Sequence, residues 1–213
     1  MWVVKLGGSL ADYPEDLRRW LKALAEAGKY RTVIVPGGSF FADWVRETQK
    51  KWGFDDVAAH AMGLRAMEQF GLMLCALQRG LVPALSETEI RKVLHENQVP
   101  VWLPVQILAS EDLSPSWDVT SDSLAAWLAK RLKAEQLVLV KSCVLPSGKV
   151  EAAELAKNGI VDAAFPSIVQ GAEFDTWLLG RKDYSRISSF LVEKQAGGAK
   201  VYCQPAGLRA SGK

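Results

Sequence analysis

Short apolar runs alternate along this chain with longer stretches whose apolar residues recur every three to four positions. Residues 3–6 and 31–36 are two such runs, and each is followed by two glycines, a serine and an amphipathic stretch. The short runs are typical of buried strands, and the longer spacing is typical of helices. This alternation predicts strand–helix units on a parallel sheet, so the expected fold class is α/β in three layers.

Capping and turn residues mark the boundaries of the predicted elements. Residues 12–15 and 86–89 match the capping box that begins a helix, and residues 146–148 match a hairpin turn. The strand-like residues 99–108 contain two prolines, which suits a sheet edge or a loop. Helices are expected at residues 17–24, 40–48, 55–79, 86–96, 124–132 and 184–193, further strands at 136–141, 174–179 and 199–204, and a frayed tail at 206–213.

Composition narrows the class of protein. The 213 residues are long enough for a sizeable core, and residues 1–213 are expected to form one domain. The net charge of +2 is too small to indicate binding to nucleic acid or to an anionic membrane. Lys5 interrupts the first apolar run, so no export signal is predicted, and the three cysteines fit neither a disulfide framework nor a metal site. We therefore expect a cytoplasmic protein without nucleic-acid or membrane partners.

The first predicted strand ends in residues that are suited to binding a phosphate. Lys5 lies near its end, and Gly7, Gly8 and Ser9 follow directly. A strand fixes the direction of the lysine side chain, while glycines let backbone N–H groups approach an anion closely. With a helix to follow, this arrangement is typical of an anion site. The alternative is a plain strand-to-helix turn in which the glycines only allow tight packing, and this stretch alone favours neither.

The second strand ends in the same way, in Gly37 and Gly38. Because parallel strands place their carboxyl ends at one edge of a sheet, two glycine loops there favour ligand binding. Neither loop fits a P-loop or a dinucleotide-binding fingerprint. Arg46, on the helix that follows, is the better candidate for an anion contact. His60 and Arg65 on the next helix are weaker candidates, since polar residues there are more often at the core or its edge.

A cluster of polar residues precedes the helix at residues 124–132. Asp122 could lie in the first turn and complement the helix dipole, which is a structural role. Alternatively, Asp118 and Asp122 could project into a cleft and hold lysine or magnesium. The polar cluster exceeds what one helix cap needs. Lys141 and Ser142 end the next buried strand, again at the edge expected to face a ligand.

Four motifs resemble the amino acid kinase superfamily, which includes acetylglutamate, carbamate, uridylate and isopentenyl phosphate kinases. They are KLGGS at residues 5–9, PGGS at 36–39, TSDSLAA at 120–126 and GIVDAAF at 159–165. The resemblance spans nearly the whole chain. It implies an open αβα sandwich with a mainly parallel central sheet, usually assembled as a homodimer or higher homo-oligomer. The acceptor is expected in the N-terminal half and ATP in the C-terminal half.

The resemblance also implies roles for individual residues. Lys5 matches the lysine that stabilises the transferring phosphoryl group, and Asp122 matches the aspartate that organises the catalytic lysines. Lys141, where many relatives have Thr or Ser, is our candidate for the second catalytic lysine, with Lys149 and Lys157 as alternatives. ATP with Mg²⁺ is expected at Gly7, Gly8, Ser9, Ser142 and Asp162, and the acceptor is expected at Gly37, Gly38, Arg46, His60 and Asp118.

The acceptor is predicted from similarity and from charge. The segments PGGSFFADWVR and AHAMGLRAMEQF are most similar to aminomethylfuran-methyl phosphate kinases of methanofuran-type cofactor biosynthesis. A phosphate monoester needs an additional cation, and the guanidinium fork of Arg46 supplies one. We therefore expect an ATP-dependent kinase that converts a small phosphomonoester into a diphosphate. The alternatives are a kinase of a carboxylate, carbamate or other phosphomonoester, and a non-catalytic relative that binds nucleotide or oxoanion; Lys5 and Asp122 favour the enzyme.

Overall fold

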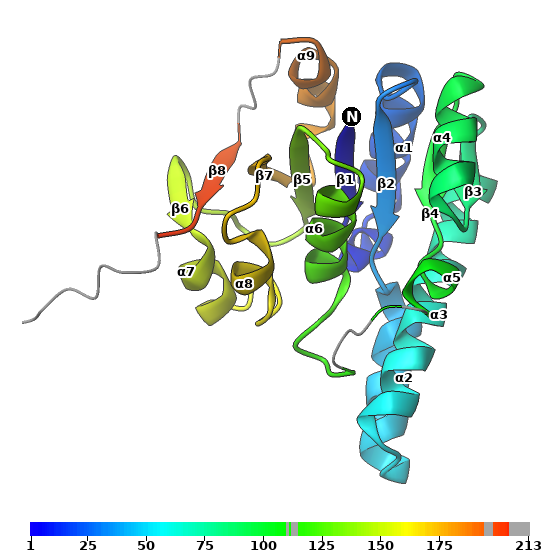
Figure 1. Cartoon of the computed structure of the whole chain (residues 1–213), viewed down its shortest axis with the longest axis vertical. Helices are drawn as coiled ribbons and strands as arrows, with labels where there is room; N and C mark the ends of the chain where they lie inside the picture. Colours follow the sequence, from blue (N-terminus) through cyan, green and yellow to red (C-terminus); the bar gives the residue numbers. More distant parts are fainter. Residues whose placement is uncertain (110, 112–114, 194–197, 205–213) are drawn as a thin grey trace, which may run out of the picture.

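In the part of the chain that the structure describes, eight strands form one continuous sheet with helices on both faces (Figure 1). The structure is a computed structural model and describes residues 1–109, 111, 115–193 and 198–204. The strand order is β3-β4-β2-β1-β5-β7-β8-β6. The strands are β1 (Trp2–Leu6), β2 (Thr32–Pro36), β3 (Leu81–Ala84), β4 (Val99–Trp102), β5 (Gln136–Lys141), β6 (Lys149–Glu151), β7 (Asp175–Gly180) and β8 (Ala199–Tyr202).

Most neighbouring strands run parallel, as the sequence predicts. The exception is the pair β7 and β8, which is antiparallel. The prediction of a hairpin at residues 146–148 is wrong, because β6 does not pair with β5 and instead pairs in parallel with β8. The fold class is confirmed as an open αβα sandwich with a mainly parallel sheet.

Alternation along the strands builds two hydrophobic cores, one on each face. On β1, Val4 and Leu6 pack with α1, α3 and α9, whereas Val3 belongs to the core that contains α4, α6 and α8. The helices are η1 (Gly8–Asp12), α1 (Pro14–Ala27), α2 (Ser39–Trp52), α3 (Asp56–Leu77), α4 (Glu87–His95), α5 (Val105–Leu108), α6 (Ser121–Arg131), α7 (Ala152–Lys157), α8 (Phe165–Val169), η2 (Asp183–Ser185) and α9 (Arg186–Glu193).

Two boundary predictions are wrong and one is confirmed. No capping box forms at residues 12–15, because the chain first makes the short helix η1 and α1 then begins at Pro14, whose fixed φ suits the first helical position. The capping box at residues 86–89 is confirmed, since the Glu89 N–H donates to Ser86 Oγ at 3.2 Å. Strand β4 is not at the edge, because β3 lies outside it. The pairing of β4 with β2 is short, which accommodates Pro100, and the second proline, Pro104, lies beyond the strand at the start of α5.

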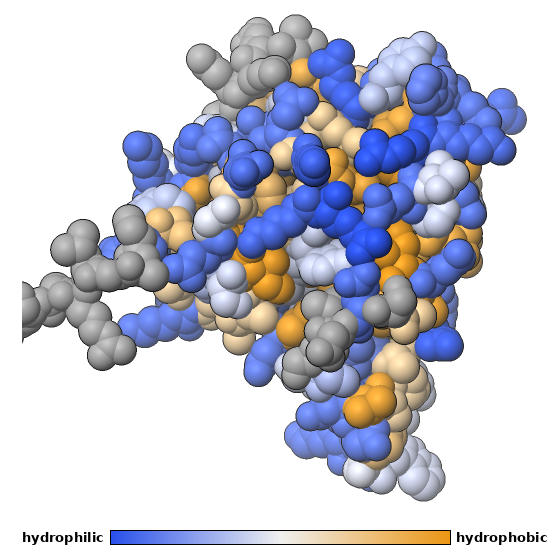
Figure 2. Space-filling view, in the orientation of Figure 1, coloured by the Kyte–Doolittle hydropathy of each residue, from blue (hydrophilic) through white to orange (hydrophobic). Residues whose placement is uncertain are grey.

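Helices α2 and α3 form a hairpin that projects beyond the sheet at the bottom of Figure 1. Large apolar side chains remain exposed on it, including Phe40, Trp44, Trp52 and Val57. Figure 2 shows apolar surface among hydrophilic residues on this projecting part. None of the helices among the described residues has both the length and the apolar character needed to cross a bilayer. The predicted tail at residues 206–213 lies outside the described residues.

Candidate active site

Strand alternation places two lysines on the same face of the sheet. Strands β1 and β5 are parallel neighbours, and Lys5 pairs in register with Leu139. Lys5 lies on the same face of β1 as Val3, and Lys141 lies on the same face of β5 as Leu137 and Leu139. Both lysines therefore reach the face covered by α6, close to the carboxyl ends of their strands.

Helix α6 brings Asp122 between the two lysines. Lys141 Nζ donates a hydrogen bond of 2.6 Å to Asp122 Oδ2, and Lys5 Nζ lies 2.9 Å from Oδ1. The Lys5 contact lacks the alignment of a hydrogen bond, so Oδ1 has no hydrogen-bond donor among the described residues. The three side chains are only 5%, 11% and 6% exposed for Lys5, Lys141 and Asp122. We call these three residues the Lys–Asp–Lys cluster.

The electrostatics of the cluster follow from its burial. Burial alone would raise the pKa of Asp122, but the charges of Lys5 and Lys141 outweigh it and hold that pKa at about 2. Burial lowers the pKa of Lys141, and the neighbouring charge of Lys5 lowers it further, although Asp122 offsets part of the effect. Two ammonium groups against one carboxylate leave an excess of positive charge in a nearly dry site. Such a site attracts an anion.

Asp122 also lies in the first turn of α6, where a carboxylate complements the helix dipole. The structural role considered for it and its contact with the lysines therefore occur together. The N-terminus of α6 is capped from a distance by Asp162, whose carboxylate accepts hydrogen bonds from Thr120, Ser123 and Phe165. The Thr120 and Ser123 N–H groups donate to Asp162 Oδ2 at 2.9 and 3.0 Å.

This use of Asp162 differs from the nucleotide contact predicted for it. Its two oxygens accept hydrogen bonds from the backbone and hydroxyls that begin α6, and those donors come from residues about 40 positions earlier in the chain. The carboxylate thereby replaces a local N-cap, since Thr120 makes no side-chain cap. Asp162 consequently fixes the helix that carries Asp122. Sequence reasoning missed this role because nothing local marks so distant a cap.

The glycine loops after β1 and β2 interlock. A Cβ on Gly8 would lie 2.2 Å from the Ser39 nitrogen, and one on Gly37 would lie 2.3 Å from the Gly8 nitrogen. Only glycines allow the two loops to approach so closely. Tight packing of the two loops is therefore sufficient reason for glycine at both positions, and it applies in addition to any binding of a ligand.

Two backbone donors expected to face an anion are already used. The Gly7 N–H donates to Val140 O at 3.0 Å, and the Gly37 N–H donates to Leu6 O at 2.8 Å. These bonds extend the parallel pairing of the strands by one step beyond their ends. The Gly7 N–H is therefore already paired within the protein, and the expected contact of Gly7 with ATP stays a prediction. Ser9 and Ser142 are brought together, with their hydroxyl oxygens 2.7 Å apart, across the ends of β1 and β5.

Ser39 is a site residue that sequence reasoning did not select. It begins α2 with a φ of 53°, in the left-handed region that a serine rarely adopts. Its side chain is buried, and Oγ has no hydrogen-bond partner among the described residues. Backbone strain and an unpaired buried hydroxyl together mark a place that a ligand would complete. The third position of the repeated Gly-Gly-Ser pattern was the available signal.

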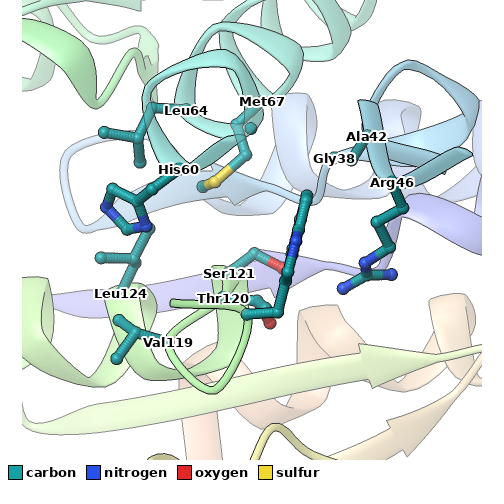
Figure 3. A pocket seen from close by; sticks show the side chains of 12 residues that line it. Gly38, Ala42, Arg46, His60, Leu64, Met67, Val119, Thr120, Ser121 and Leu124 are labelled. Atoms are coloured by element: carbon teal, nitrogen blue, oxygen red, sulfur yellow. The ribbon is translucent and has the colours of Figure 1, made fainter. Parts of the chain in front are cut away.

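A narrow cavity of about 50 Å³ lies beside this helix N-terminus (Figure 3). Arg46 from α2 and His60 from α3 both line it, and they lie at opposite sides of the view in Figure 3. Burial lowers the pKa of His60, and a hydrogen bond with the Ser116 backbone partly opposes this shift. We call the cavity the Arg46 pocket; it is lined by Gly38, Ala42, Arg46, His60, Gly63, Leu64, Met67, Trp117, Val119, Thr120, Ser121 and Leu124.

Other predicted residues lie away from these two places. Asp118 is exposed and does not line the Arg46 pocket, and its backbone carbonyl accepts a hydrogen bond from the Ala164 N–H. Arg65 lines a separate groove on the projecting hairpin. Lys149 and Lys157 are exposed, so among the candidates for a second lysine only Lys141 joins Asp122.

The arrangement is suited to moving a phosphoryl group. Phosphoryl transfer needs neutralisation of charge and alignment of the reactants more than covalent help from the protein. The Lys–Asp–Lys cluster supplies fixed positive charge at the carboxyl ends of β1 and β5, and the Arg46 pocket opens near the end of β2. Fold and site together define a phosphotransferase with a Gly-Gly-Ser loop after each of two parallel strands.

Comparisons with known proteins agree. The chain belongs to the Amino acid kinase family, which it matches over residues 1–143. It is 25% identical to [5-(aminomethyl)furan-3-yl]methyl phosphate kinase of Methanocaldococcus jannaschii over 219 residues, covering 98% of this chain and 99% of that protein. This protein is accordingly a kinase.

Solved structures show the same fold. Uridylate kinase from Archaeoglobus fulgidus superposes with a TM-score of 0.73 at 16% identity, covering 95% of this chain and 100% of that chain. An isopentenyl phosphate kinase superposes with a TM-score of 0.64 at 16% identity and the same coverage. These superpositions confirm the expected fold, and the family match over residues 1–143 confirms the expected superfamily.

Proposed function

We propose that this protein transfers the γ-phosphoryl group of ATP to a small phosphomonoester and releases ADP and a diphosphate. An oxygen of the acceptor phosphate attacks the γ-phosphorus, and the bond between that phosphorus and the bridging oxygen of ADP breaks. Residues 1–213 act as one domain, with the acceptor in the N-terminal half and ATP in the C-terminal half. By similarity to the relative from Methanocaldococcus jannaschii, the preferred acceptor is [5-(aminomethyl)furan-3-yl]methyl phosphate, in the biosynthesis of a methanofuran-type C1 carrier.

The Lys–Asp–Lys cluster is the observation that carries this proposal. Its three side chains are nearly buried, and two cations face one carboxylate. In the proposed reaction Lys5 and Lys141 bind the phosphoryl oxygens on which charge develops, and Asp122 holds both ammonium groups in place. A protein that only stored an oxoanion would have no need of a carboxylate between its two lysines.

A hollow suited to the nucleotide begins two residues beyond Lys141. It has a volume of about 260 Å³ and is lined by the segment after β5, the end of β7 and the start of β8, including Cys143, Gly148, Gly180 and Ala199. Its place at the carboxyl ends of β5 and β7 is the edge at which parallel sheets bind ligands. We infer that the nucleoside of ATP occupies this hollow while its phosphates extend toward Ser9, Ser142 and Lys141.

The acceptor phosphate is assigned to the start of α2. The unpaired hydroxyl of Ser39 and the guanidinium of Arg46 are both on this helix. Arg46 and Gly38, the residue before Ser39, line the Arg46 pocket. A helix N-terminus favours an anion, and Arg46 can grip a phosphate through two parallel hydrogen bonds. This placement puts the acceptor on one side of the cluster and ATP on the other.

Magnesium is proposed to arrive with the nucleotide. The described residues contain no group of three or more His, Cys, Asp or Glu side chains that would hold a metal ion. Mg²⁺ is commonly bound through substrate phosphates and water with few protein ligands. When bound, Mg²⁺ neutralises charge on the β- and γ-phosphates. The lysines of the cluster act on the same phosphates from the protein side.

We also propose a homodimer or higher homo-oligomer, located in the cytoplasm. The exposed apolar side chains on the α2–α3 hairpin support self-association, because a groove on that hairpin is lined by Phe40, Phe41, Trp44 and Met62. Light scattering after gel filtration tests this part. A monomer at all concentrations would contradict it, whereas a Trp44→Glu variant is expected to shift an oligomer toward monomer.

The function itself is tested by ADP release. The protein is mixed with ATP, Mg²⁺ and, in separate reactions, small phosphomonoesters, carboxylates and carbamate. We expect ADP release with phosphomonoesters, fastest with the aminomethylfuran-methyl phosphate. Faster turnover of a carboxylate or of carbamate would overturn the proposal, and so would the absence of turnover with every phosphomonoester.

A further inference from the structure

Trp117 links three separate parts of the Arg46 pocket, although no motif includes it. The Arg46 guanidinium lies over its ring at 4.3 Å from the ring centroid. The indole N–H donates a hydrogen bond of 2.7 Å to Gln49 Oε1 on α2. On α3, the ring lies over Gly63, where a Cβ would be 3.6 Å from two ring carbons. These contacts fix the indole against α2 and α3 even though it comes from the segment before α6.

The contact with Trp117 also determines which N–H groups of Arg46 are free to bind a ligand. Arg46 also forms an ion pair with Asp43. The two exposed side chains are 3.7 Å apart, so this ion pair holds Arg46 only weakly. A guanidinium held over an aromatic ring keeps the N–H groups at its outer edge free to donate. Trp117 therefore leaves Arg46 able to bind a phosphate through that edge.

The rest of the described pocket lining is mostly apolar and carries no negative charge, with His60, Thr120 and Ser121 as its polar side chains. Leu64 and Met67 from α3 and Leu124 from α6 line it with the indole, and no carboxylate is among the lining residues that the structure describes. The cavity is narrow, so an acceptor has to widen the gap between Trp117 and these apolar side chains. A flat ring needs the least widening, and an aromatic ring gains most from contact with the indole.

We propose that Trp117 is a specificity-determining residue, whose indole is the wall against which a flat ring of the acceptor packs while Arg46 binds the acceptor phosphate. This proposal rests on the proposed function. It assigns the substrate class as phosphomonoesters in which one methylene group joins a flat ring to the phosphate oxygen. Open-chain phosphomonoesters of equal charge are poorer acceptors because they gain only the phosphate contact.

The test compares two acceptors of similar size and equal charge, benzyl phosphate and 3-methylbutyl phosphate. The wild-type protein is expected to show a higher kcat/KM with benzyl phosphate. Trp117→Leu should lower kcat/KM for benzyl phosphate about tenfold, as expected for the loss of an aromatic pair, and for 3-methylbutyl phosphate less than about threefold. Trp117→Phe should keep most of the preference. Trp52→Leu, which removes an exposed tryptophan at the end of α2, is the matched control and should change neither value.

A second variant protects the test against misfolding of Trp117→Leu. Gln49→Leu removes the partner of the indole N–H but keeps the ring, so the ring preference should fall in the same direction by a smaller factor. An equal loss for both acceptors, or a wild-type protein without ring preference, overturns the role of Trp117 and leaves the proposed function standing. If the wild-type protein phosphorylates carboxylates and no phosphomonoester, the proposed function fails and this inference fails with it.

Discussion

The Lys–Asp–Lys cluster and the Arg46 pocket lie at the same edge of the sheet but are built in different ways. The cluster is charged and nearly buried, and two adjacent strands and a helix fix its members. The pocket is mostly apolar, Arg46 is the one permanent charge among its described lining residues, and one wall comes from the segment before α6. This difference indicates that the strands and helix of the fold position the groups for phosphoryl transfer, whereas a few side chains of the pocket select the acceptor. Changes in the cluster should therefore lower kcat, and changes in the pocket should raise the acceptor KM.

The largest effect is expected from Lys5→Met. Removing an ammonium that binds the transferring group should lower kcat by about 100-fold or more, as for other deletions of preformed electrostatic contacts. The fold should persist, because Lys141 still pairs with Asp122. Steady-state kinetics and thermal unfolding measure both quantities. Lys157→Met, on the exposed face of α7, is the control, and a fully active Lys5→Met protein would refute the catalytic assignment.

Arg46→Ala should weaken binding of the acceptor in the Arg46 pocket. Charge-assisted hydrogen bonds contribute about 1.5 to 3 kcal/mol, so the acceptor KM should rise roughly 10- to 100-fold while the KM for ATP stays unchanged. Arg65→Ala, on the neighbouring helix but outside the pocket, provides the matched control. Normal acceptor binding by Arg46→Ala would mean that the acceptor lies elsewhere.

The cluster should also give the protein a distinctive sensitivity to acid. The pKa of Asp122 is lowered in the folded protein from 3.8 to about 2, which corresponds to roughly 2 kcal/mol of stability. Because the folded pKa is the lower one, this stability is complete above about pH 4 and is lost as the pH falls toward 2. Urea unfolding of wild type and Asp122→Asn across this range should show the difference between them shrinking as the pH falls. A difference independent of pH would contradict the pairing.

The smallest effect concerns Asp162, which acts on the cluster through α6. Asp162→Asn should lower the free energy of unfolding by about 1 to 2 kcal/mol, since it weakens the cap of α6. We expect a smaller loss of kcat than in Lys5→Met, with an unchanged KM for ATP. Asp118→Asn, an exposed change in the segment before the same helix, should alter neither stability nor activity. A large rise in the KM for ATP would instead favour the nucleotide contact predicted from the sequence.

Local patterns predicted the elements better than the contacts between them. The strand at residues 136–141 has the predicted bounds, because an unbroken apolar run ending in lysine allows few alternatives. The meeting of Lys5, Asp122 and Lys141 was inferred from resemblance, and the sheet register explains it. The distant cap by Asp162, the use of the Gly7 N–H by Val140, and the position of Trp117 depend on tertiary packing. No spacing in the sequence encodes these contacts.

The central claim is that the cluster drives phosphoryl transfer and that the acceptor group is a phosphate rather than a carboxylate or carbamate, and it is tested most directly by the bond that forms. ³¹P NMR of a reaction containing ATP, Mg²⁺ and an aminomethylfuran-methyl phosphate reports that bond. The account predicts growth of coupled diphosphate resonances from the product together with ADP, and their absence with the Lys5→Met protein. An unchanged acceptor resonance in the wild-type reaction, or an acyl phosphate formed in its place when carboxylates are supplied, would contradict it.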